Sequence, residues 1–189
     1  KLLYRMIKAD RLSSVIFFGP PGTGKTSLAR LIAKVTNMPF ARLNAVSAGV
    51  GDIKQIVADT QNSLLNPQGR TVLFIDEIHR FNKLQQDALL PFVEDGTIVL
   101  IGATTENPFF EVNKAIISRS TVFQLYPLTE NDIKKVINNA LTDKERGYGN
   151  FDISITDEAI EFLSQSSSGD ARVALNAIEL AVLTSKSLD

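Results

Sequence analysis

The segment Gly19–Thr26 has residue types and a spacing suited to holding the phosphates of a nucleoside triphosphate. It reads Gly-Pro-Pro-Gly-Thr-Gly-Lys-Thr, and its glycines let consecutive backbone N–H groups turn toward phosphate oxygens, with the positive end of a following helix dipole behind them. Lys25 is expected to reach the β- and γ-phosphates, and the Thr26 hydroxyl to ligate a Mg²⁺ ion that bridges them. The predicted nucleotide-binding residues are Gly19, Pro20, Pro21, Gly22, Thr23, Gly24, Lys25, Thr26 and Ser27, together with Arg172 near the C-terminus.

Two carboxylates follow a second apolar segment. The run Val72–Ile75 is typical of a strand buried on both faces, and Asp76 and Glu77 come directly after it. Open α/β sheets bind ligands beyond the carboxyl ends of their strands. Asp76 is therefore predicted to hold Mg²⁺ through a water molecule, and Glu77 to polarise the attacking water as a general base. Two acidic residues in an ordinary turn are the alternative, which the phosphate-binding pattern upstream disfavours.

Two threonines end a third apolar segment. Thr104 and Thr105 follow Ile98–Ala103, and either hydroxyl could lie beside the γ-phosphate and orient the attacking water. A threonine that only bonds to turn backbone is as plausible for each residue alone, and the position at a predicted strand end favours the functional interpretation. His79 follows the two carboxylates. We interpret it as a hydrogen-bonded structural residue rather than a catalyst, because a base needs suitable geometry before a suitable pKa.

Two arginines complete the candidate set. Arg119 lies between a short predicted helix and the last predicted strand, and it could reach the phosphate-binding segment of a neighbouring subunit. Arg172 lies in the first turn of the final predicted helix and could approach the γ-phosphate. A guanidinium stays charged and suits the dispersed charge of a phosphoryl transition state, although a solvated surface arginine is the competing interpretation for each. The predicted catalytic residues are Lys25, Glu77, Thr104, Thr105, Arg119 and Arg172.

The elements that must position these residues follow from hydrophobic periodicity. Between residues 15 and 126, short apolar runs alternate with helix-period segments, which is the pattern of a parallel α/β sheet covered on both faces. The predicted strands are Val15–Phe18, Pro39–Leu43, Val72–Ile75, Ile98–Ala103 and Val122–Leu125, and the predicted helices lie near 25–36, 50–65, 82–95 and 112–118.

After Pro127 the pattern becomes helical. Thr129 and Asp132 have the spacing of a capping box, and further helices are expected over about 157–165 and from about residue 170. We therefore predict an α/β nucleotide-binding domain over residues 1–126 and a small α-helical lid over residues 127–189.

Composition limits the possible functions. The chain has 189 residues, is 44% hydrophobic, has a net charge of −1 and contains no cysteine, so disulfides and thiolate metal sites are excluded and any metal must be a hard cation with oxygen ligands. The near-zero charge gives no bulk electrostatic argument for nucleic-acid binding. No apolar run approaches the ~20 residues of a membrane span, and no signal peptide is recognisable. We expect a cytoplasmic protein, and a first residue other than Met suggests a fragment of a longer one.

Together these motifs resemble those of AAA+ ATPases of the clamp-loader and Holliday-junction-motor branch, which are P-loop NTPases. The chain is similar, piece by piece, to the replication-associated recombination protein A family, whose eukaryotic member is the Werner-helicase-interacting ATPase. The segments that carry this resemblance are FFGPPGTGKT, LFIDEIHRFNKLQQDALLPFVEDGTI, IGATTENPFFEVN, SRS and GDARVALNAIE. The resemblance implies that Thr104 or Thr105 is the sensor 1 residue, Arg119 the trans-acting arginine finger and Arg172 the sensor 2 arginine.

The resemblance also implies an activity and partners. Such proteins are DNA-dependent ATPases that use ATP and Mg²⁺ at stalled replication forks, in recombination and repair, and they form homotetramers through a C-terminal region that this sequence lacks. The expected partners are single-stranded or forked DNA, replication proteins and further copies of the chain, with no membrane; a bacterial member would associate with the nucleoid. The finger motif ends in Ser120 where these families commonly have cysteine, a change we expect to be tolerated because the arginine carries the charge.

Three alternatives remain. A Holliday-junction branch-migration motor shares the Asp76–Arg80 pattern but differs from this chain after the two threonines. A clamp-loader subunit of the zinc-bearing type is disfavoured by the lack of cysteine. A nucleotide-gated binding module without significant turnover is disfavoured by the presence of Glu77 and Arg119.

Overall fold

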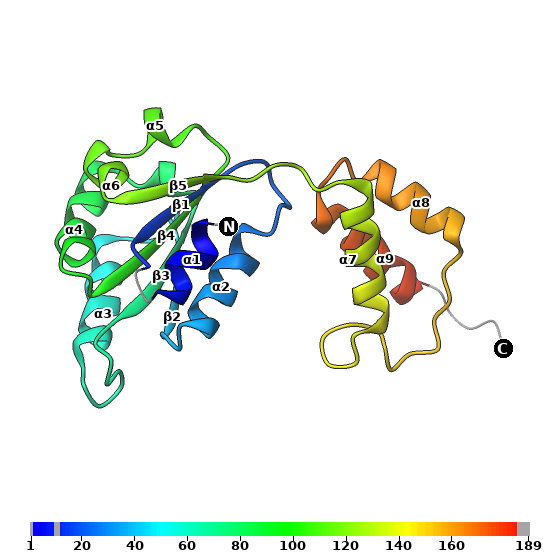
Figure 1. Ribbon diagram of the computed structural model, residues 1–189, viewed down its shortest axis with the longest axis horizontal. Helices are drawn as coiled ribbons and strands as arrows, with labels where there is room; N and C mark the ends of the chain where they lie inside the picture. Colours follow the sequence, from blue (N-terminus) through cyan, green and yellow to red (C-terminus); the bar gives the residue numbers. More distant parts are fainter. Residues whose placement is uncertain (1, 10–11, 185–189) are drawn as a thin grey trace. The chain divides into compact units, whose positions relative to one another are not determined.

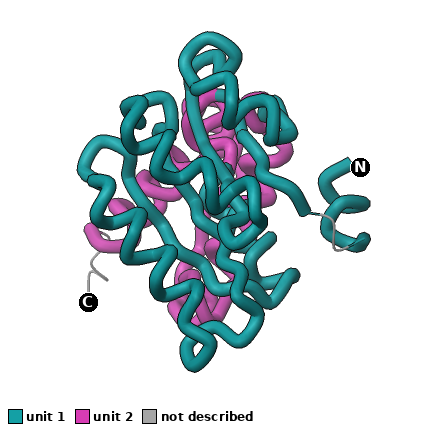
Figure 2. The backbone as a smooth tube through the Cα atoms, turned by 90° about the vertical axis from the view of Figure 1, so that its left-hand side faces the viewer, with its two compact units in different colours: residues 1–19, 25–125 teal, residues 20–24, 126–189 magenta. Residues whose placement is uncertain are grey.

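The structure of the protein is a computed structural model that describes residues 2–9 and 12–184. Its elements fall into two compact units (Figure 2), one of residues 1–19 and 25–125 and the other of residues 20–24 and 126–189. Residues 20–24, in the middle of the predicted phosphate-binding segment, thus group with the helical C-terminal unit. Across the described part of the chain, every helix is too short or too polar to span a lipid bilayer.

The first unit is built on a five-stranded sheet (Figure 1). Its strands lie in the order β2-β3-β4-β1-β5, and every neighbouring pair is parallel. The strands are β1 Ser14–Phe18, β2 Phe40–Asn44, β3 Thr71–Asp76, β4 Ile98–Thr104 and β5 Ser120–Gln124. The predicted fold class is confirmed, because the parallel sheet has flanking helices and is followed by a helical unit.

Two apolar clusters form the core of this unit, one on each face of the sheet. Alternate residues of one strand enter different clusters: Ile16 belongs to one, and Val15 and Phe17 to the other. This follows from the two-residue period of a strand. The first cluster packs against α3 and α4, and the second against α2 (Figure 1). The helices of this unit are α1 Leu2–Lys8, α2 Lys25–Val35, α3 Val50–Gln61, η1 Ile78–Arg80, α4 Lys83–Glu94, α5 Pro108–Glu111 and α6 Lys114–Ser118.

Two predicted helix boundaries were wrong, for local reasons. The helix expected near 112–118 is α6, which begins only at Lys114 because the Asn113 side chain accepts a backbone N–H bond and caps it there. Helix α5, which is capped in the same way by Asn107, lies before the predicted range. The helix expected over 50–65 ends at Gln61, because the chain leaves the helical conformation at Asn62.

The second unit contains three helices in its described part, α7 Glu130–Thr142, α8 Asp157–Ser166 and α9 Ala171–Thr184. Thr129 and Asp132 form the predicted capping box at the start of α7. The helices pack around the buried side chains Ile133, Ile137, Ala174 and Ile178. These residues lie four apart on α7 and on α9, so each helix presents one apolar face to the shared core.

Candidate active site

The phosphate-binding segment joins β1 to α2 through a glycine-rich loop. Gly19, Gly22 and Gly24 have φ angles of 153°, 70° and 85°, a region that side chains with a Cβ rarely adopt. A Cβ on Gly19 would also lie 2.2 Å from the carbonyl oxygen of Leu125. Helix α2 begins at Lys25, directly after the loop. The backbone therefore has the strand, loop and helix arrangement that cradles phosphates at a helix N-terminus.

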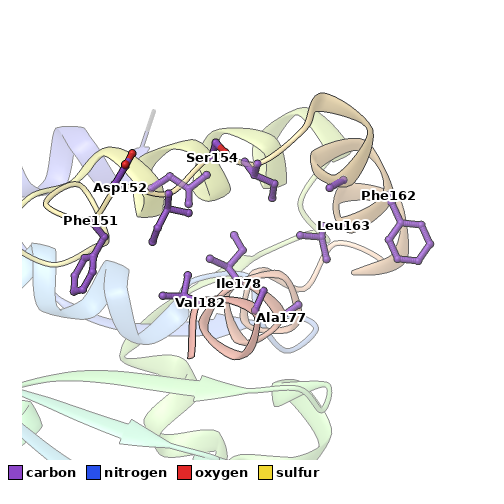
Figure 3. A pocket seen from close by; sticks show the side chains of 13 residues that line it. Phe151, Asp152, Ser154, Phe162, Leu163, Ala177, Ile178 and Val182 are labelled. Carbon is purple, nitrogen blue, oxygen red and sulfur yellow. The ribbon is translucent and has the colours of Figure 1, made fainter. Parts of the chain in front are cut away.

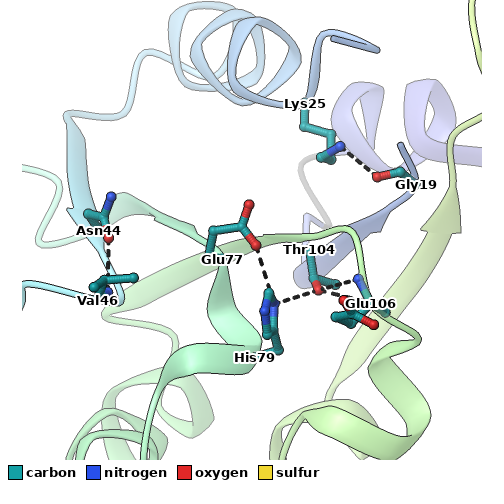
Figure 4. A network of polar contacts seen from close by, with 8 residues as sticks. All are labelled: Gly19, Lys25, Asn44, Val46, Glu77, His79, Thr104 and Glu106. Atoms are coloured by element: carbon teal, nitrogen blue, oxygen red, sulfur yellow. Dashed lines mark hydrogen bonds and ion pairs between the residues drawn. The ribbon is translucent and has the colours of Figure 1, made fainter. Parts of the chain in front are cut away.

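The side chains of this segment bond back to the loop. Lys25 Nζ donates to the carbonyl oxygen of Gly19 at 2.8 Å (Figure 4), and Thr23 Oγ1 donates to that of Pro20 at 3.0 Å. Thr26 is half-buried in the first turn of α2, whereas Ser27 is exposed. The lysine is thus held at the loop by one hydrogen bond of an ammonium group that carries three hydrogens.

The middle of the loop contacts the start of α9 within the second unit. The Ala171 N–H donates to the carbonyl oxygen of Gly22 at 3.2 Å, and a Cβ on Gly22 would lie 1.7 Å from Asp170 Oδ1. Asp170 Oδ1 also accepts the Arg172 N–H at 2.8 Å and lies 3.6 Å from Arg172 Nε. Arg172 is therefore one residue beyond a direct loop contact, on the first turn of α9.

Thr104 lies beside the start of the loop. It is paired with Phe18 in the β1–β4 register, and its carbonyl oxygen accepts the Gly19 N–H at 3.1 Å. Its side chain is buried, at 1% exposure, whereas Thr105 is exposed. The structure thus distinguishes the two threonines that the sequence left equivalent.

Glu77, His79 and Thr104 are brought together at the carboxyl edge of the sheet (Figure 4). Glu77 has left-handed backbone angles, φ 53° and ψ 46°, so the chain turns sharply between β3 and η1. His79 Nδ1 lies 3.4 Å from Glu77 Oε2 and 2.9 Å from Thr104 Oγ1. A candidate base and a candidate water-orienting hydroxyl therefore share one imidazole neighbour.

Asp76 forms an ion pair that the sequence analysis missed. Arg42 Nη2 lies 2.9 Å from Asp76 Oδ2, because β2 and β3 are neighbours in the sheet. Nothing in the sequence alone identifies which strand adjoins β3. In the same register Asn44 is paired with Asp76, and the Asn44 side chain accepts the Val46 N–H at 2.9 Å (Figure 4).

The donor set fits magnesium bound together with a nucleotide. Among the described residues, no group of three or more His, Cys, Asp or Glu side chains could hold a metal ion by itself. Mg²⁺ uses one or two protein oxygens and completes its shell with phosphate oxygens and water. Thr26 and Asp76 provide one hydroxyl and one carboxylate, which is the small oxygen set that such a site requires.

Arg119 is bonded within its own unit. Arg119 Nη2 lies 2.5 Å from Glu94 Oε1, and Nη1 donates to the Ala115 carbonyl oxygen at 3.0 Å and to Ser118 Oγ at 3.1 Å. The arginine side chain is 42% exposed. It is thus held at the C-terminal end of α6 and remains accessible from solvent.

A pocket lies in the second unit (Figure 3), and none of its lining residues is a predicted site residue. It has a volume of about 710 Å³ and is lined mainly by apolar side chains of α8, α9 and the segment 151–155. Its lining contains no cationic group, so it does not have the chemistry of a phosphate site.

Comparison with known proteins agrees with this geometry. Residues 15–128, more than half of the chain, match the family described as "ATPase family associated with various cellular activities (AAA)". The chain is 49% identical over 180 residues to the replication-associated recombination protein A of Escherichia coli K12, which covers 95% of this chain and 40% of that protein. It is 42% identical to the ATPase WRNIP1 of Dictyostelium discoideum, covering 98% of this chain and 21% of that protein.

A solved structure, the Thermotoga maritima RuvB Holliday junction branch migration motor, matches with a TM-score of 0.74 and 28% identity. The match covers 99% of this chain and 62% of that one. The chain thus spans less than two thirds of the length of each of these relatives. The expected resemblance is confirmed, and the chain belongs to the AAA family of ATPases.

Proposed function

We propose that this chain is the ATP-hydrolysing part of a DNA-dependent ATPase that acts at stalled replication forks, in recombination and repair. The similarity to replication-associated recombination protein A over 95% of the chain supports this proposal. Such a protein would work in the cytoplasm with the chromosome, as a homo-oligomer, and the predicted tetramer would depend on sequence beyond this chain. Within it, residues 1–126 would bind the nucleotide and residues 127–189 would act as the lid.

The observation that best supports ATP turnover is the chain of contacts from Glu77 through His79 to Thr104. Its terminal member, Thr104, bonds the first loop glycine through its carbonyl oxygen. In our proposal Glu77 is the general base and Thr104, rather than Thr105, orients the attacking water. The exposed position of Thr105 is the reason for this choice.

The remaining residues would bind ATP and its metal. The loop residues 19–24 and Ser27 would surround the phosphates through the backbone, and Lys25 would neutralise the β- and γ-phosphates. Thr26 and Asp76 would hold Mg²⁺, which when bound offsets the charge that develops on the transferred phosphoryl group. Arg172 would contact the γ-phosphate from α9, and Arg119 would act on the site of a neighbouring subunit.

A Holliday-junction motor is the second candidate. The match to the RuvB motor at a TM-score of 0.74 favours it, whereas the 49% identity over 180 residues favours the first candidate. A binding module that only switches with ATP would need no base, so the grouping of Glu77, His79 and Thr104 counts against it.

The proposed function is tested by ATP hydrolysis of the full-length protein with single-stranded, duplex, forked and four-way-junction DNA. Fork-dependent stimulation is expected, because the ATPase would couple its nucleotide state to the DNA it engages. Stimulation only by four-way junctions would favour the second candidate. Equal rates with and without every DNA would contradict DNA-dependent action, and nucleotide binding without hydrolysis under all conditions would favour the switching module.

A further inference from the structure

His79 contacts two residues of the proposed reaction centre and is itself largely buried. Its side chain is only 10% exposed, whereas that of Glu77 is 40% exposed. The imidazole lies on the three-residue helix η1, directly after the left-handed turn at Glu77. Figure 4 shows the Glu77 and Thr104 side chains converging on the same edge of the ring. The ring therefore has a defined position, set by the fold, from which one nitrogen reaches both partners.

The two neighbours of His79 Nδ1 indicate which ring nitrogen carries the hydrogen. His79 Nδ1 lies 3.4 Å from a carboxylate oxygen of Glu77, and an ionised carboxylate can only accept hydrogen bonds. If Nδ1 carried no hydrogen, its lone pair would face the lone pairs of that oxygen and the two would repel. A hydrogen on Nδ1 would be attracted to that carboxylate and can be donated to Thr104 Oγ1 at 2.9 Å.

The bonds of Thr104 agree with this assignment. A hydroxyl has one hydrogen to donate and two lone pairs with which to accept. Thr104 Oγ1 accepts the Glu106 N–H at 3.0 Å and lies 3.3 Å from the Glu106 carbonyl oxygen. If His79 is the second donor, the hydroxyl hydrogen is directed to that carbonyl, and every donor and acceptor of the hydroxyl is used. With a bare Nδ1 the hydroxyl would instead donate to the ring and one of its lone pairs would stay unused, so a hydrogen on Nδ1 uses one more hydrogen-bonding site of Thr104.

We propose that His79 is a positioning residue for ATP hydrolysis, whose Nδ1–H holds the Glu77 carboxylate and the Thr104 hydroxyl in one fixed arrangement. This inference rests on the proposed roles of Glu77 and Thr104. The link extends to the phosphate-binding loop, because the Thr104 carbonyl oxygen bonds the Gly19 N–H. Loss of the imidazole hydrogen would leave Glu77 free to rotate at the solvent-exposed edge of the sheet. The effect would fall on turnover, since neither contact of His79 involves a nucleotide-binding residue of the loop.

Two substitutions that differ in the position of one amide test this inference. The side-chain amide of His79→Asn can occupy the place of Nδ1, whereas the longer side chain of His79→Gln directs its amide toward the place of Nε2. In the full-length protein, His79→Asn is expected to keep kcat within a few-fold. His79→Gln is expected to lower kcat about 10- to 100-fold, the scale of an ångström-level misplacement, with KM and ATP binding unchanged.

The kcat values of the two variants show whether the hydrogen on Nδ1 matters for turnover. Equal kcat for both variants, whether high or low, would overturn the assignment to Nδ1, provided that melting temperatures show both to be folded. Thr104→Val should remove most of the difference between the two variants, because their common partner is then absent; a difference that persists in full would count against a link through Thr104. The Glu77→Gln variant distinguishes a failure of the proposed base from a failure of the proposed role of His79. If it hydrolyses ATP normally, the base assignment fails, whereas an inactive Glu77→Gln with a normal His79→Gln overturns only the role of His79.

A spectroscopic test is available because the sequence contains a single histidine. Long-range ¹H–¹⁵N spectra of the chain will therefore show one imidazole. We expect a hydrogen on Nδ1, either as the neutral Nδ1–H tautomer or in the imidazolium. A neutral ring with its hydrogen on Nε2 would contradict the assignment.

Discussion

Replacing Arg119 tests whether the active site is completed by a neighbouring subunit. In this structure Arg119 pairs with Glu94, and the two side chains are 42% and 43% exposed. An ion pair this exposed contributes about 0.2–1 kcal/mol after solvent screening, so release of the arginine costs at most about a fivefold factor. An arginine that stabilises a phosphoryl transition state is worth about 10³- to 10⁵-fold in kcat. The stabilisation of the transition state at a neighbouring site therefore greatly exceeds the free energy lost when Arg119 leaves Glu94.

We expect Arg119→Ala to lower kcat of the assembled protein about 10³-fold or more, with ATP affinity unchanged. Glu94→Gln should leave kcat the same or raise it by less than about fivefold, since it only releases the arginine. Phosphate release at saturating ATP, with assembly checked by light scattering, measures both. Arg146→Ala is the matched control, because it removes another arginine from an exposed pair, with Asp143 at 3.3 Å. A wild-type rate for assembled Arg119→Ala would refute the reasoning.

Mixing two inactive variants tests whether the arginine acts between subunits. Lys25→Ala disables the phosphate-binding loop and Arg119→Ala the proposed finger. In mixed oligomers some interfaces pair an intact loop with an intact arginine, so part of the activity should return. No recovery, despite confirmed mixing, would show that Arg119 does not act in trans.

Two further predictions concern the loop and the helical unit. In a titration with a fluorescent nucleotide, Gly22→Ala should weaken ATP binding more than Gly24→Ala. Both residues have positive φ angles, which cost about 1–2 kcal/mol for alanine. Only at Gly22 would the added Cβ also clash with Asp170. Equal losses would show that the contact with α9 does not shape the loop. Thr129→Ala should destabilise the helical unit by about 1 kcal/mol in denaturant melts, as loss of a helix cap does. The hydrogen bond from the Thr129 side chain is the main cause that lowers the pKa of the Asp132 carboxyl. The stability that this hydrogen bond contributes is therefore present above the ordinary aspartate pKa and is lost as the pH falls through the lowered pKa. This loss of stability in acid should be smaller in Thr129→Ala, and an unchanged acid dependence would show that the cap is unimportant.

The local features of the site could be predicted from the sequence because each depends on a few adjacent residues. The glycines of the loop and the carboxylates after β3 are set by neighbours in the chain, and the same holds for the Thr129 cap. The fold class followed from alternating apolar runs. These patterns depend on the types and spacing of neighbouring residues, which are read directly from the sequence.

The contacts between strands could not be predicted, because they depend on strand order and register. Arg42 reaches Asp76 only because β2 adjoins β3, and Thr104 adjoins Phe18 only because β4 lies beside β1. The choice between Thr104 and Thr105 depends on where β4 ends, because Thr104 is its last residue and is buried, whereas Thr105 lies beyond the strand and is exposed. His79 was correctly expected to be hydrogen-bonded, but its two partners lie on different segments, so their identity required the structure.

The central claim is that Glu77 activates the water that hydrolyses ATP. The most direct test is a single-turnover measurement with Glu77→Gln in the full-length protein, with bound ATP and its conversion to ADP followed separately. We predict that the variant binds ATP with wild-type affinity and hydrolyses it at least about 10²-fold more slowly, because a general base contributes about 10²- to 10⁴-fold. Conversion of bound ATP at the wild-type rate would contradict the account.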